Sequence, residues 1–326
     1  MKILIRADGG KTIGMGHIMR TSVLAEELKQ FAEVSYACLE GEEFDLGVSY
    51  LKQNGYSVLR LPKEDLLNRL KDIDYDCMMV DNYNVDSDFF NGLKRKGTLL
   101  GYFDDLKKEE YPVDFIINQN PYALDLSYRK EKYLKTFLGI KYVLLRKEFQ
   151  NQSKRYIDPV CKDILVTVGG SDINRITEKI ILNILKEELE ATLHVVIGPA
   201  FPKGYLDTFR HPKVKLYHNP TMSDLMKRCD LAISACGSTV YELAACGTPT
   251  IGIVVTDNQI MASEKLEELG VIKVSNIETI LDSIKEMTYE KRLEMSTKGQ
   301  TLVDGLGAKR LASEIIHLIN ERITGV

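Results

Sequence analysis

The strongest constraint on the fold is a pattern that begins each half of this 326-residue chain. A short apolar run is followed by a glycine-containing turn, and the turn is followed by apolar residues at helical spacing. In the first half these segments are residues 1–6, 13–17 and 18–30, and in the second half they are 163–168, 169–172 and 176–185. A strand that leads through a glycine turn into a helix is typical of parallel βαβ units.

Strand-like and helical segments alternate through the rest of both halves. The predicted strands are 33–39, 56–61, 76–81, 98–103, 114–118, 193–197, 214–217, 231–234, 250–255 and 271–274, and the predicted helices include 44–54, 66–70, 86–96, 239–245 and 259–269. Residues 144–162 are rich in charge and amides and have no clear periodicity, which predicts an interdomain linker.

The predicted fold class is therefore α/β, with two Rossmann-like domains facing each other across a cleft. We place the N-terminal domain at residues 1–150 and the C-terminal domain at 151–326. The last helix, about 308–323, is a candidate to cross back onto the N-terminal domain.

Composition narrows the class of partner. The net charge of −4 argues against a nucleic-acid or anionic membrane surface, because binding those needs clustered Lys and Arg. Arg6 and Asp8 interrupt the apolar run near the N-terminus, and no stretch approaches the ~18 apolar residues of a membrane span. Six dispersed cysteines without a C-x-x-C pair favour reduced thiols over zinc or disulfides. We expect a cytoplasmic protein without stable membrane insertion, and the sequence does not give its oligomeric state.

The turn after the first strand contains Gly14, Gly16, His17 and Arg20, and we expect Gly14, Gly16 and Arg20 to contribute to substrate binding. It lies at the carboxyl end of a predicted strand, where open α/β sheets place ligands. Backbone N–H groups at the following helix start favour negative charge. A histidine there can bind, orient or deprotonate a group beside an anion.

Two turns in the second half are candidates for holding a phosphate. Gly169, Gly170 and Ser171 open a helix, which Ser171 or Asp172 can cap, although many α/β proteins carry such a turn for packing alone. This turn matches neither the dinucleotide fingerprint nor a Walker loop. The second turn, Gly237, Ser238 and Thr239, starts a helix whose amides can cradle a phosphate.

Each polar residue near these turns has a structural and a functional interpretation. Glu242, about one helical turn after Thr239, is either a solvated helix carboxylate or an acceptor for a ribose diol, and its position favours the second. Asn258 and Gln259 follow the next strand. Asn258 is either an N-cap or a ligand for a hydroxyl or water, and we expect Gln259 to bind substrate.

Carboxylates end two strands of the N-terminal half. Asp81, Tyr83 and Asp86 follow one strand, and Asp104 and Asp105 follow the next. Paired carboxylates are compatible with acid/base or metal chemistry. Equally, the aspartates can cap helices or pair with an arginine, Arg6 or Arg20, and we favour that structural role while leaving Tyr83 open. The other histidines have no metal-ligand spacing and are given no role: 194, 211, 218 and 317.

Three motifs together resemble a known family. Gly14-x-Gly16-His17-x-x-Arg20, Asp81-x-Tyr83-x-x-Asp86 and Gly237-Ser-Thr…Glu242…Gly247-x-Pro249 are similar to motifs of the UDP-sugar hydrolases of pseudaminic acid biosynthesis. That family is related to glycosyltransferases of the GT-B fold, including the MurG type, and to spore-coat polysaccharide proteins of the SpsG type. The resemblance extends over nearly the whole chain.

The resemblance implies hydrolysis of UDP-2,4-diacetamido-2,4,6-trideoxy-β-L-altropyranose to the free sugar and UDP, without a metal or cofactor. It implies that His17 activates or orients water at the anomeric carbon and that Tyr83 and Asn258 line the sugar and water site. Glu242 would bind the ribose, Gly237, Ser238 and Thr239 the diphosphate, and the Gly169–Ser171 turn would lie near the nucleotide.

Elementary chemistry agrees with these implied roles. UDP is a weak base as a leaving group, so the general acid of ordinary glycosidases is dispensable. The protein then needs one group for water and preorganised donors for the diphosphate, and attack opposite the diphosphate would invert the anomeric centre. A glycosyltransferase of the same fold, which would need an acceptor, and a non-catalytic nucleotide-sugar-binding module are the alternatives. The absence of a clear amphipathic docking stretch favours the hydrolase.

Overall fold

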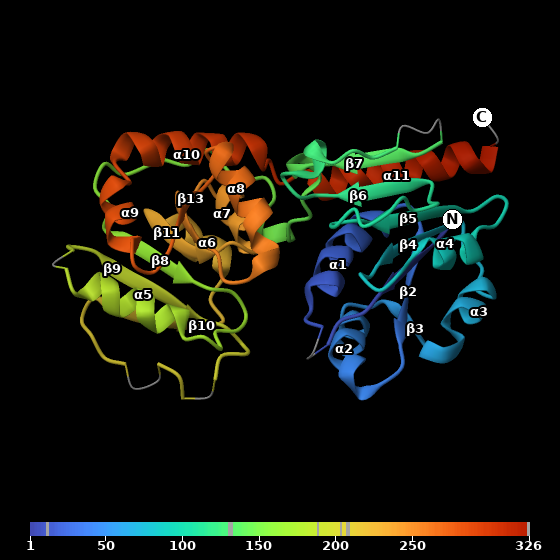
Figure 1. The fold of residues 1–326 in the computed structure, drawn as a ribbon, viewed down its shortest axis with the longest axis horizontal. Coiled ribbons are helices and arrows are strands. Elements are labelled where there is room, and N and C mark those ends of the chain that lie inside the picture. The colour runs from blue at the N-terminus through green and yellow to red at the C-terminus, as the bar shows by residue number, and fades with distance from the viewer. Residues whose placement is uncertain (11–12, 130–132, 188, 203, 207–208, 325–326) are drawn as a thin grey trace. The chain divides into compact units, whose positions relative to one another are not determined.

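The computed structural model describes residues 1–10, 13–129, 133–187, 189–202, 204–206 and 209–324. The chain forms two compact units, each a parallel α/β domain (Figure 1). Unit 1 comprises Met1–Arg146 together with the chain from Leu306 onward, and unit 2 comprises Lys147–Gly305. The chain therefore passes between the units twice, after Arg146 and after Gly305.

Unit 1 is built on a parallel sheet of seven strands within the described residues. In spatial order the strands are β3 (Ser57–Leu61), β2 (Glu33–Leu39), β1 (Lys2–Ala7), β4 (Cys77–Asp81), β5 (Leu99–Phe103), β6 (Phe115–Asn118) and β7 (Lys135–Leu138). The helices of this unit are α1 (Gly16–Leu28), α2 (Asp45–Gln53), α3 (Leu66–Lys71), α4 (Ser87–Leu93) and α11 (Gly307–Thr324). Because all strands are parallel, their carboxyl ends form one edge of the sheet.

Both faces of this sheet are covered by helices. Ile3 and Ile5 of β1 belong to the core cluster shared with α1 and α11, whereas Leu4 belongs to the cluster shared with α3 and α4. Successive side chains of a strand point to opposite faces, so a run of consecutive apolar residues is what a doubly covered strand requires. Each such buried side chain contributes roughly 1.5–3 kcal/mol relative to an exposed one.

Helix α11 carries the C-terminal part of the chain back to unit 1. Its residues Leu311, Ala312, Ile315 and Ile319 lie on one face of the helix and are all buried in the core that contains Ile18 of α1. The exposed side carries polar groups, and its Arg322 pairs with an aspartate of unit 1, Asp114. An amphipathic helix needs an apolar surface to cover, and unit 1 provides that surface.

Unit 2 has a parallel sheet of six strands within the described residues. In spatial order the strands are β10 (Val214–His218), β9 (Thr192–Ile197), β8 (Asp163–Thr167), β11 (Leu231–Ala235), β12 (Thr250–Ile253) and β13 (Lys273–Ser275). Its helices are α5 (Ile176–Leu185), α6 (Met222–Arg228), α7 (Thr239–Ala245), α8 (Ile260–Glu268), α9 (Ile280–Glu286) and α10 (Tyr289–Leu302). Helices α5 and α7 have the bounds that the apolar spacing predicts.

The segment 144–162, which the sequence predicts as a linker, is packed in large part onto unit 2. Phe149 and Ile157 are buried. The guanidinium of Arg155 donates to the backbone carbonyls of Met226 and Cys229. This segment is thus an ordered part of the fold, and the passage into unit 2 follows Arg146.

Strand β7 is one element that the sequence analysis did not predict. It pairs with β6 at the edge of the sheet, with Phe115 opposite Lys135. Of its four residues only Phe137 is buried. A short edge strand that buries one side chain leaves almost no hydrophobic pattern in the sequence.

Two further expectations concern the cysteines and membranes. All six cysteines are free thiols, five buried and Cys161 half-buried. Burial raises the pKa of these thiols, to about 12 for Cys38 and about 11 for Cys161. Over the part of the chain that the structure describes, no helix combines the length and the apolar character of a membrane span.

Candidate active site

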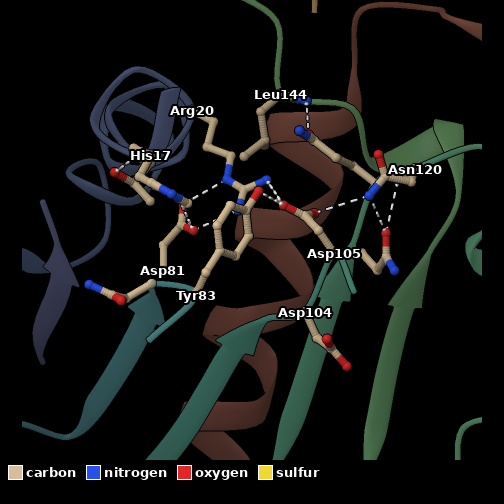
Figure 2. Close-up of polar contacts among 12 residues, drawn as sticks. His17, Arg20, Asp81, Tyr83, Asp104, Asp105, Asn120 and Leu144 are labelled. Atoms are coloured by element: carbon tan, nitrogen blue, oxygen red, sulfur yellow. Dashed lines mark hydrogen bonds and ion pairs between the residues drawn. The ribbon is translucent and has the colours of Figure 1, made fainter. Parts of the chain in front are cut away.

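Polar side chains gather at the carboxyl edge of the unit 1 sheet (Figure 2). Asp81 is the last residue of β4, and Tyr83 follows two residues later. Asp105 and Asn120 lie two residues beyond the ends of β5 and β6. Because β4, β5 and β6 are neighbours in the sheet, the residues after their ends come together. His17 and Arg20, in the first turns of α1, approach the same place from the end of β1.

The carboxylate of Asp81 is the centre of this group. Its side chain is fully buried. It accepts two hydrogen bonds from Arg20, from Nε to Oδ2 and from NH2 to Oδ1, both 2.6 Å long. His17 Nδ1 lies 2.6 Å from the same Oδ1. Burial alone would raise the pKa of Asp81, but the charge and hydrogen bonds of Arg20 and the contact with His17 hold that pKa at about 2. Asp81 is therefore ionised at neutral pH.

The contact with Asp81 determines the tautomer of His17. An ionised carboxylate can only accept, so the Nδ1 atom of His17 carries the proton. In the neutral ring the other nitrogen, Nε2, is then an acceptor with a free lone pair. The His17 side chain retains 15% of its surface exposed, against none for Asp81. A buried carboxylate that orients a partly exposed imidazole is the arrangement of a general base and its orienting group.

A second carboxylate, Asp105, lies on the other side of Arg20. Its Oδ2 atom accepts from Arg20 NH1 at 2.7 Å and from the Tyr83 hydroxyl at 2.8 Å. Asn120 Nδ2 donates to Oδ1 at 3.1 Å. The ring of Tyr83 meets the His17 ring edge to face, with centroids 4.7 Å apart. These contacts bring together three of the residues expected from the sequence, His17, Arg20 and Tyr83.

Arg20 is held between the two carboxylates. It also lies over the ring of Phe103, with its central carbon 5.0 Å from the ring centroid. Burial would lower the pKa of its guanidinium, but the charges of Asp105 and Asp81 raise it well above its usual value. Arg20 is therefore a permanent cation that fixes the separation of Asp81 and Asp105.

The remaining carboxylates of this edge have structural partners. Asp86 caps α4 by accepting from the backbone N–H of Phe89. Asp8 forms a buried ion pair of 2.6 Å with Arg6. Asp104 points away from the Asp105 cluster (Figure 2) and accepts from the Lys107 backbone N–H. The predicted capping role describes Asp86, and the predicted pairing with an arginine describes Asp81, which also contacts His17. Asp104 has neither role, because one of its oxygens closes a turn and the other has no hydrogen-bond partner among the described residues.

The two glycines of the first turn have different local requirements. Gly14 has a φ of +76°, a conformation that L side chains rarely adopt, and its carbonyl accepts from the Gly10 N–H at 3.0 Å. A Cβ added to Gly16 would meet no described atom within 4 Å. The packing of the described residues does not demand glycine at position 16, which leaves room for a ligand at the start of α1.

In unit 2, the turn after β8 is fixed by Asp172. The carboxylate of Asp172 accepts from the backbone N–H groups of Ile176 and Thr177 and thereby caps α5, whereas Ser171 is exposed. Gly169 has a φ of +93°, and Cβ atoms built on Gly169 or Gly170 would meet no described atom within 4 Å. The Cα side of both glycines is therefore uncovered, whereas the Gly170 carbonyl accepts from the Ala200 N–H at 2.9 Å.

The other predicted unit 2 residues follow β11 and β12, the next strands of that sheet. Gly237 and Ser238 precede α7, Thr239 is its first residue, and Glu242 lies half-buried in its first turn. Gln259 Oε1 accepts from the Val255 N–H at 3.0 Å and so ties the turn after β12 to its strand. The exposed Asn258 accepts a hydrogen bond of 2.6 Å from the Thr256 hydroxyl. These residues therefore share the carboxyl edge of the unit 2 sheet with the Gly169 turn.

Among the described residues no group of three or more His, Cys, Asp or Glu is placed to hold a metal ion. His194 is buried and hydrogen-bonded to Asp163 and Tyr217. Burial lowers its pKa although Asp163 acts in the opposite direction, so we regard His194 as a neutral core residue.

Sequence reasoning missed part of the site in unit 1. Asn120 was not considered, and Asp105 was assigned a structural role. A positional signal exists, since Tyr83, Asp105 and Asn120 each stand two residues beyond the end of a neighbouring parallel strand. That signal depends on knowing both the strand ends and the strand order.

Comparison with known proteins identifies relatives over most of the chain, although no family model matches. The chain is 31% identical to the Helicobacter pylori protein named pseudaminic acid cytidylyltransferase and UDP-2,4-diacetamido-2,4,6-trideoxy-beta-L-altropyranose hydrolase, over 89% of this chain and 52% of that protein. It is 28% identical to the Campylobacter jejuni hydrolase of the latter name, over 74% of this chain and 87% of the relative. Identity to the Bacillus subtilis spore coat polysaccharide biosynthesis protein SpsG is 24%, over 99% of this chain and 100% of that protein. The chain spans about half the length of two of the curated relatives it matches.

Solved structures support the fold class. The glycotransferase of kitacinnamycin superposes with a TM-score of 0.66 at 14% identity, covering 99% of both chains. The glycosyltransferase VinC in complex with DTDP gives 0.65 at 11% identity, covering 100% of both chains. Together with the two parallel sheets, these neighbours confirm the GT-B fold of paired Rossmann-like domains. The relatives confirm the resemblance found in the motifs.

Proposed function

We propose that this chain is a UDP-sugar hydrolase that cleaves the bond between the sugar and the diphosphate with water as the acceptor. The observation that carries the proposal is the His17–Asp81 pair, in which the buried carboxylate contacts Nδ1 and leaves Nε2 of the neutral imidazole as an acceptor. A transferase also needs a base for its acceptor, so the choice of water rests on the two relatives named as hydrolases. The proposed substrate class is a UDP-linked diacetamido-trideoxyhexose, as in those names, from pseudaminic acid or related surface-polysaccharide biosynthesis.

The proposed reaction uses one base and a stabilised leaving group. Water attacks the anomeric carbon while its proton passes to His17 Nε2. The bond from that carbon to the diphosphate oxygen breaks, and its electron pair leaves with UDP. The ionised Asp81 stabilises the imidazolium that forms, and Arg20 keeps Asp81 ionised. Attack on the face opposite the leaving group inverts the anomeric centre.

The proposed UDP site lies in unit 2. Gly237, Ser238 and Thr239 at the start of α7 would hold the diphosphate, with Gly169–Ser171 nearby and Glu242 on the ribose. A Cβ at Gly237 would come no closer than 3.8 Å to a described atom, so its glycine suits close approach by a ligand. In this proposal Asn258 lines the sugar and water site and Gln259 supports its turn.

The direct test is incubation of the protein with a panel of UDP-diacetamido-trideoxyhexoses and no acceptor. We expect stoichiometric UDP and free sugar, with the first-formed anomer inverted when observed by NMR. Release of UDP only after a glycan or lipid acceptor is added would instead establish the glycosyltransferase alternative. The SpsG relative, which matches essentially the full length of both chains, makes that alternative the one to test. Binding without turnover under both conditions would indicate a nucleotide-sugar-binding module.

Replacement of Glu242 by alanine tests the ribose assignment independently of turnover. A hydrogen bond to a charged group contributes about 1.5–3 kcal/mol, so we expect the Kd for UDP, measured by calorimetry, to rise about 10- to 100-fold. Glu242→Gln, which keeps one acceptor oxygen, should weaken binding less. An unchanged Kd in the alanine variant would remove Glu242 from the UDP site.

A further inference from the structure

We propose that Asp105 is a positioning residue, which fixes Tyr83 so that its hydroxyl oxygen faces the reaction site only as a hydrogen-bond acceptor. Together with His17 Nε2, Tyr83 then offers two acceptors to the two protons of one water molecule. This inference rests on the proposed hydrolase function and deepens it, because it names the residues that orient the attacking water.

The contacts of Asp105 are suited to this role. Both oxygens of its buried carboxylate accept hydrogen bonds. Oδ2 accepts from Arg20 and from Tyr83, and Oδ1 accepts from Asn120. The Tyr122 hydroxyl also donates to the Asp105 backbone carbonyl at 3.0 Å. Donors from three chain segments therefore hold this carboxylate, although Asp105 belongs to no helix or strand.

The direction of the Tyr83 hydrogen bond follows from the identity of its partner. A phenol has one proton, and a carboxylate paired with a guanidinium can only accept. The Tyr83 proton is therefore committed to Asp105 Oδ2, and the lone pairs on the hydroxyl oxygen remain for other donors. Burial and the negative charge of Asp105 raise the pKa of Tyr83, so the phenol stays protonated. Tyr83 is consequently unsuited to donate to a substrate oxygen.

His17 also faces the reaction site as a hydrogen-bond acceptor, because its proton is already donated to a carboxylate. Its Nδ1 proton is committed to Asp81, and the two rings lie edge to face with centroids 4.7 Å apart. A water that donates one proton to His17 Nε2 and the other to the Tyr83 oxygen retains a lone pair to direct at an electrophile. Fixing the orientation of a nucleophile in this way accounts for a large part of the rate advantage that a bound nucleophile has over one free in solution.

The guanidinium of Arg20 connects the two carboxylates that orient His17 and Tyr83. Arg20 donates to Asp81, which orients His17, and to Asp105, which orients Tyr83. The chain of contacts therefore runs from His17 through Asp81, Arg20 and Asp105 to Tyr83 (Figure 2). Tyr83 itself is 40% exposed, so without Asp105 its hydroxyl would have freedom to turn toward solvent.

The first experiment is a double-mutant cycle on the hydrolysis rate. Loss of a group that orients a reacting partner typically costs 10- to 100-fold, and we expect Asp105→Ala to lower kcat by about that factor with little change in KM. Tyr83→Phe should have a similar effect. In the Tyr83→Phe background the Asp105→Ala loss should shrink at least threefold, because the two changes disable the same acceptor. Equal Asp105→Ala losses in both backgrounds would overturn the proposal.

Two further variants separate positioning from folding. Asp105→Asn keeps a carbonyl oxygen that can accept the Tyr83 proton, so it should recover part of the activity lost in Asp105→Ala. Asp104→Asn is the matched control, since Asp104 is the adjacent buried carboxylate and points away from the cluster. It should leave kcat within about twofold. A loss in Asp104→Asn as large as in Asp105→Ala would attribute the effect to the loop rather than to Asp105.

The second experiment needs no substrate and so remains informative if the proposed hydrolysis fails. Ultraviolet difference titration of wild type against Tyr83→Phe isolates the ionisation of the Tyr83 phenol. Asp105→Ala removes a negative charge and leaves Arg20, so the pKa of Tyr83 should fall by more than one unit. An unchanged Tyr83 titration would show that Asp105 does not hold this hydroxyl, whether or not the protein hydrolyses a UDP-sugar.

Discussion

Replacement of His17 by alanine should lower the rate of sugar release by about 10³-fold, within the range that a general base contributes. The reason is the fixed tautomer, since Asp81 holds the Nδ1 proton and leaves Nε2 as the acceptor for a proton of water. UDP affinity should remain within about twofold, because the proposed nucleotide residues belong to unit 2. The measurements are single-turnover hydrolysis and UDP titration calorimetry.

A matched control for this variant is His317→Ala. His317 lies on α11, and its side chain is 68% exposed. Its loss should change neither the hydrolysis rate nor UDP affinity. If His17→Ala turns over at the wild-type rate, His17 has no part in the mechanism. If UDP affinity falls with the rate, His17 contributes to nucleotide binding instead.

Replacement of Asp81 by asparagine should lower kcat by about 10²- to 10⁴-fold, although the side chain keeps its shape. The carboxylate accepts from His17 and Arg20 on Oδ1 and from Arg20 on Oδ2. Asparagine has only one acceptor oxygen. Its amide must face either Arg20, where donor meets donor, or His17, where it forces the proton onto Nε2 and removes the base.

The same variant should be less stable, with a characteristic dependence on pH. Removing one partner of a buried ion pair costs about 3 kcal/mol, measured as the difference in free energy of unfolding in urea. The pKa of Asp81 is about 2 in the folded protein and near 3.9 in an unfolded chain. The charge therefore stabilises the fold above pH ~4, and its contribution is lost as the pH falls toward 2. The difference between wild type and variant should shrink over that interval.

Asp88→Asn is a suitable control for both measurements. Asp88 is an exposed residue in the first turn of α4, a few residues from Asp81 in the sequence. It should leave the rate and the stability nearly unchanged. An Asp81→Asn variant with wild-type activity would contradict the orienting role, and a pH-independent stability difference would contradict the depressed pKa.

The fold was accessible from the sequence because it depends on local patterns. Buried parallel strands are continuous apolar runs, and amphipathic helices repeat their apolar residues at helical spacing. The limits of α5 and α7 follow from such patterns together with the flanking glycine turns. Strand β7 was missed because only Phe137 is buried in it, and one residue carries no periodicity.

The sequence by itself determined the two parallel α/β halves, the glycine turns at strand ends and the position of His17 at the start of a helix. It did not determine the partners of His17. Asp81 is 64 residues away from it, and Arg20 and Asp105 are separated by 85. The order of the strands brings these residues together, and that order is set by packing across the whole unit. Only the tertiary structure could therefore decide that Asp81 orients the histidine and that Asp105 holds Tyr83.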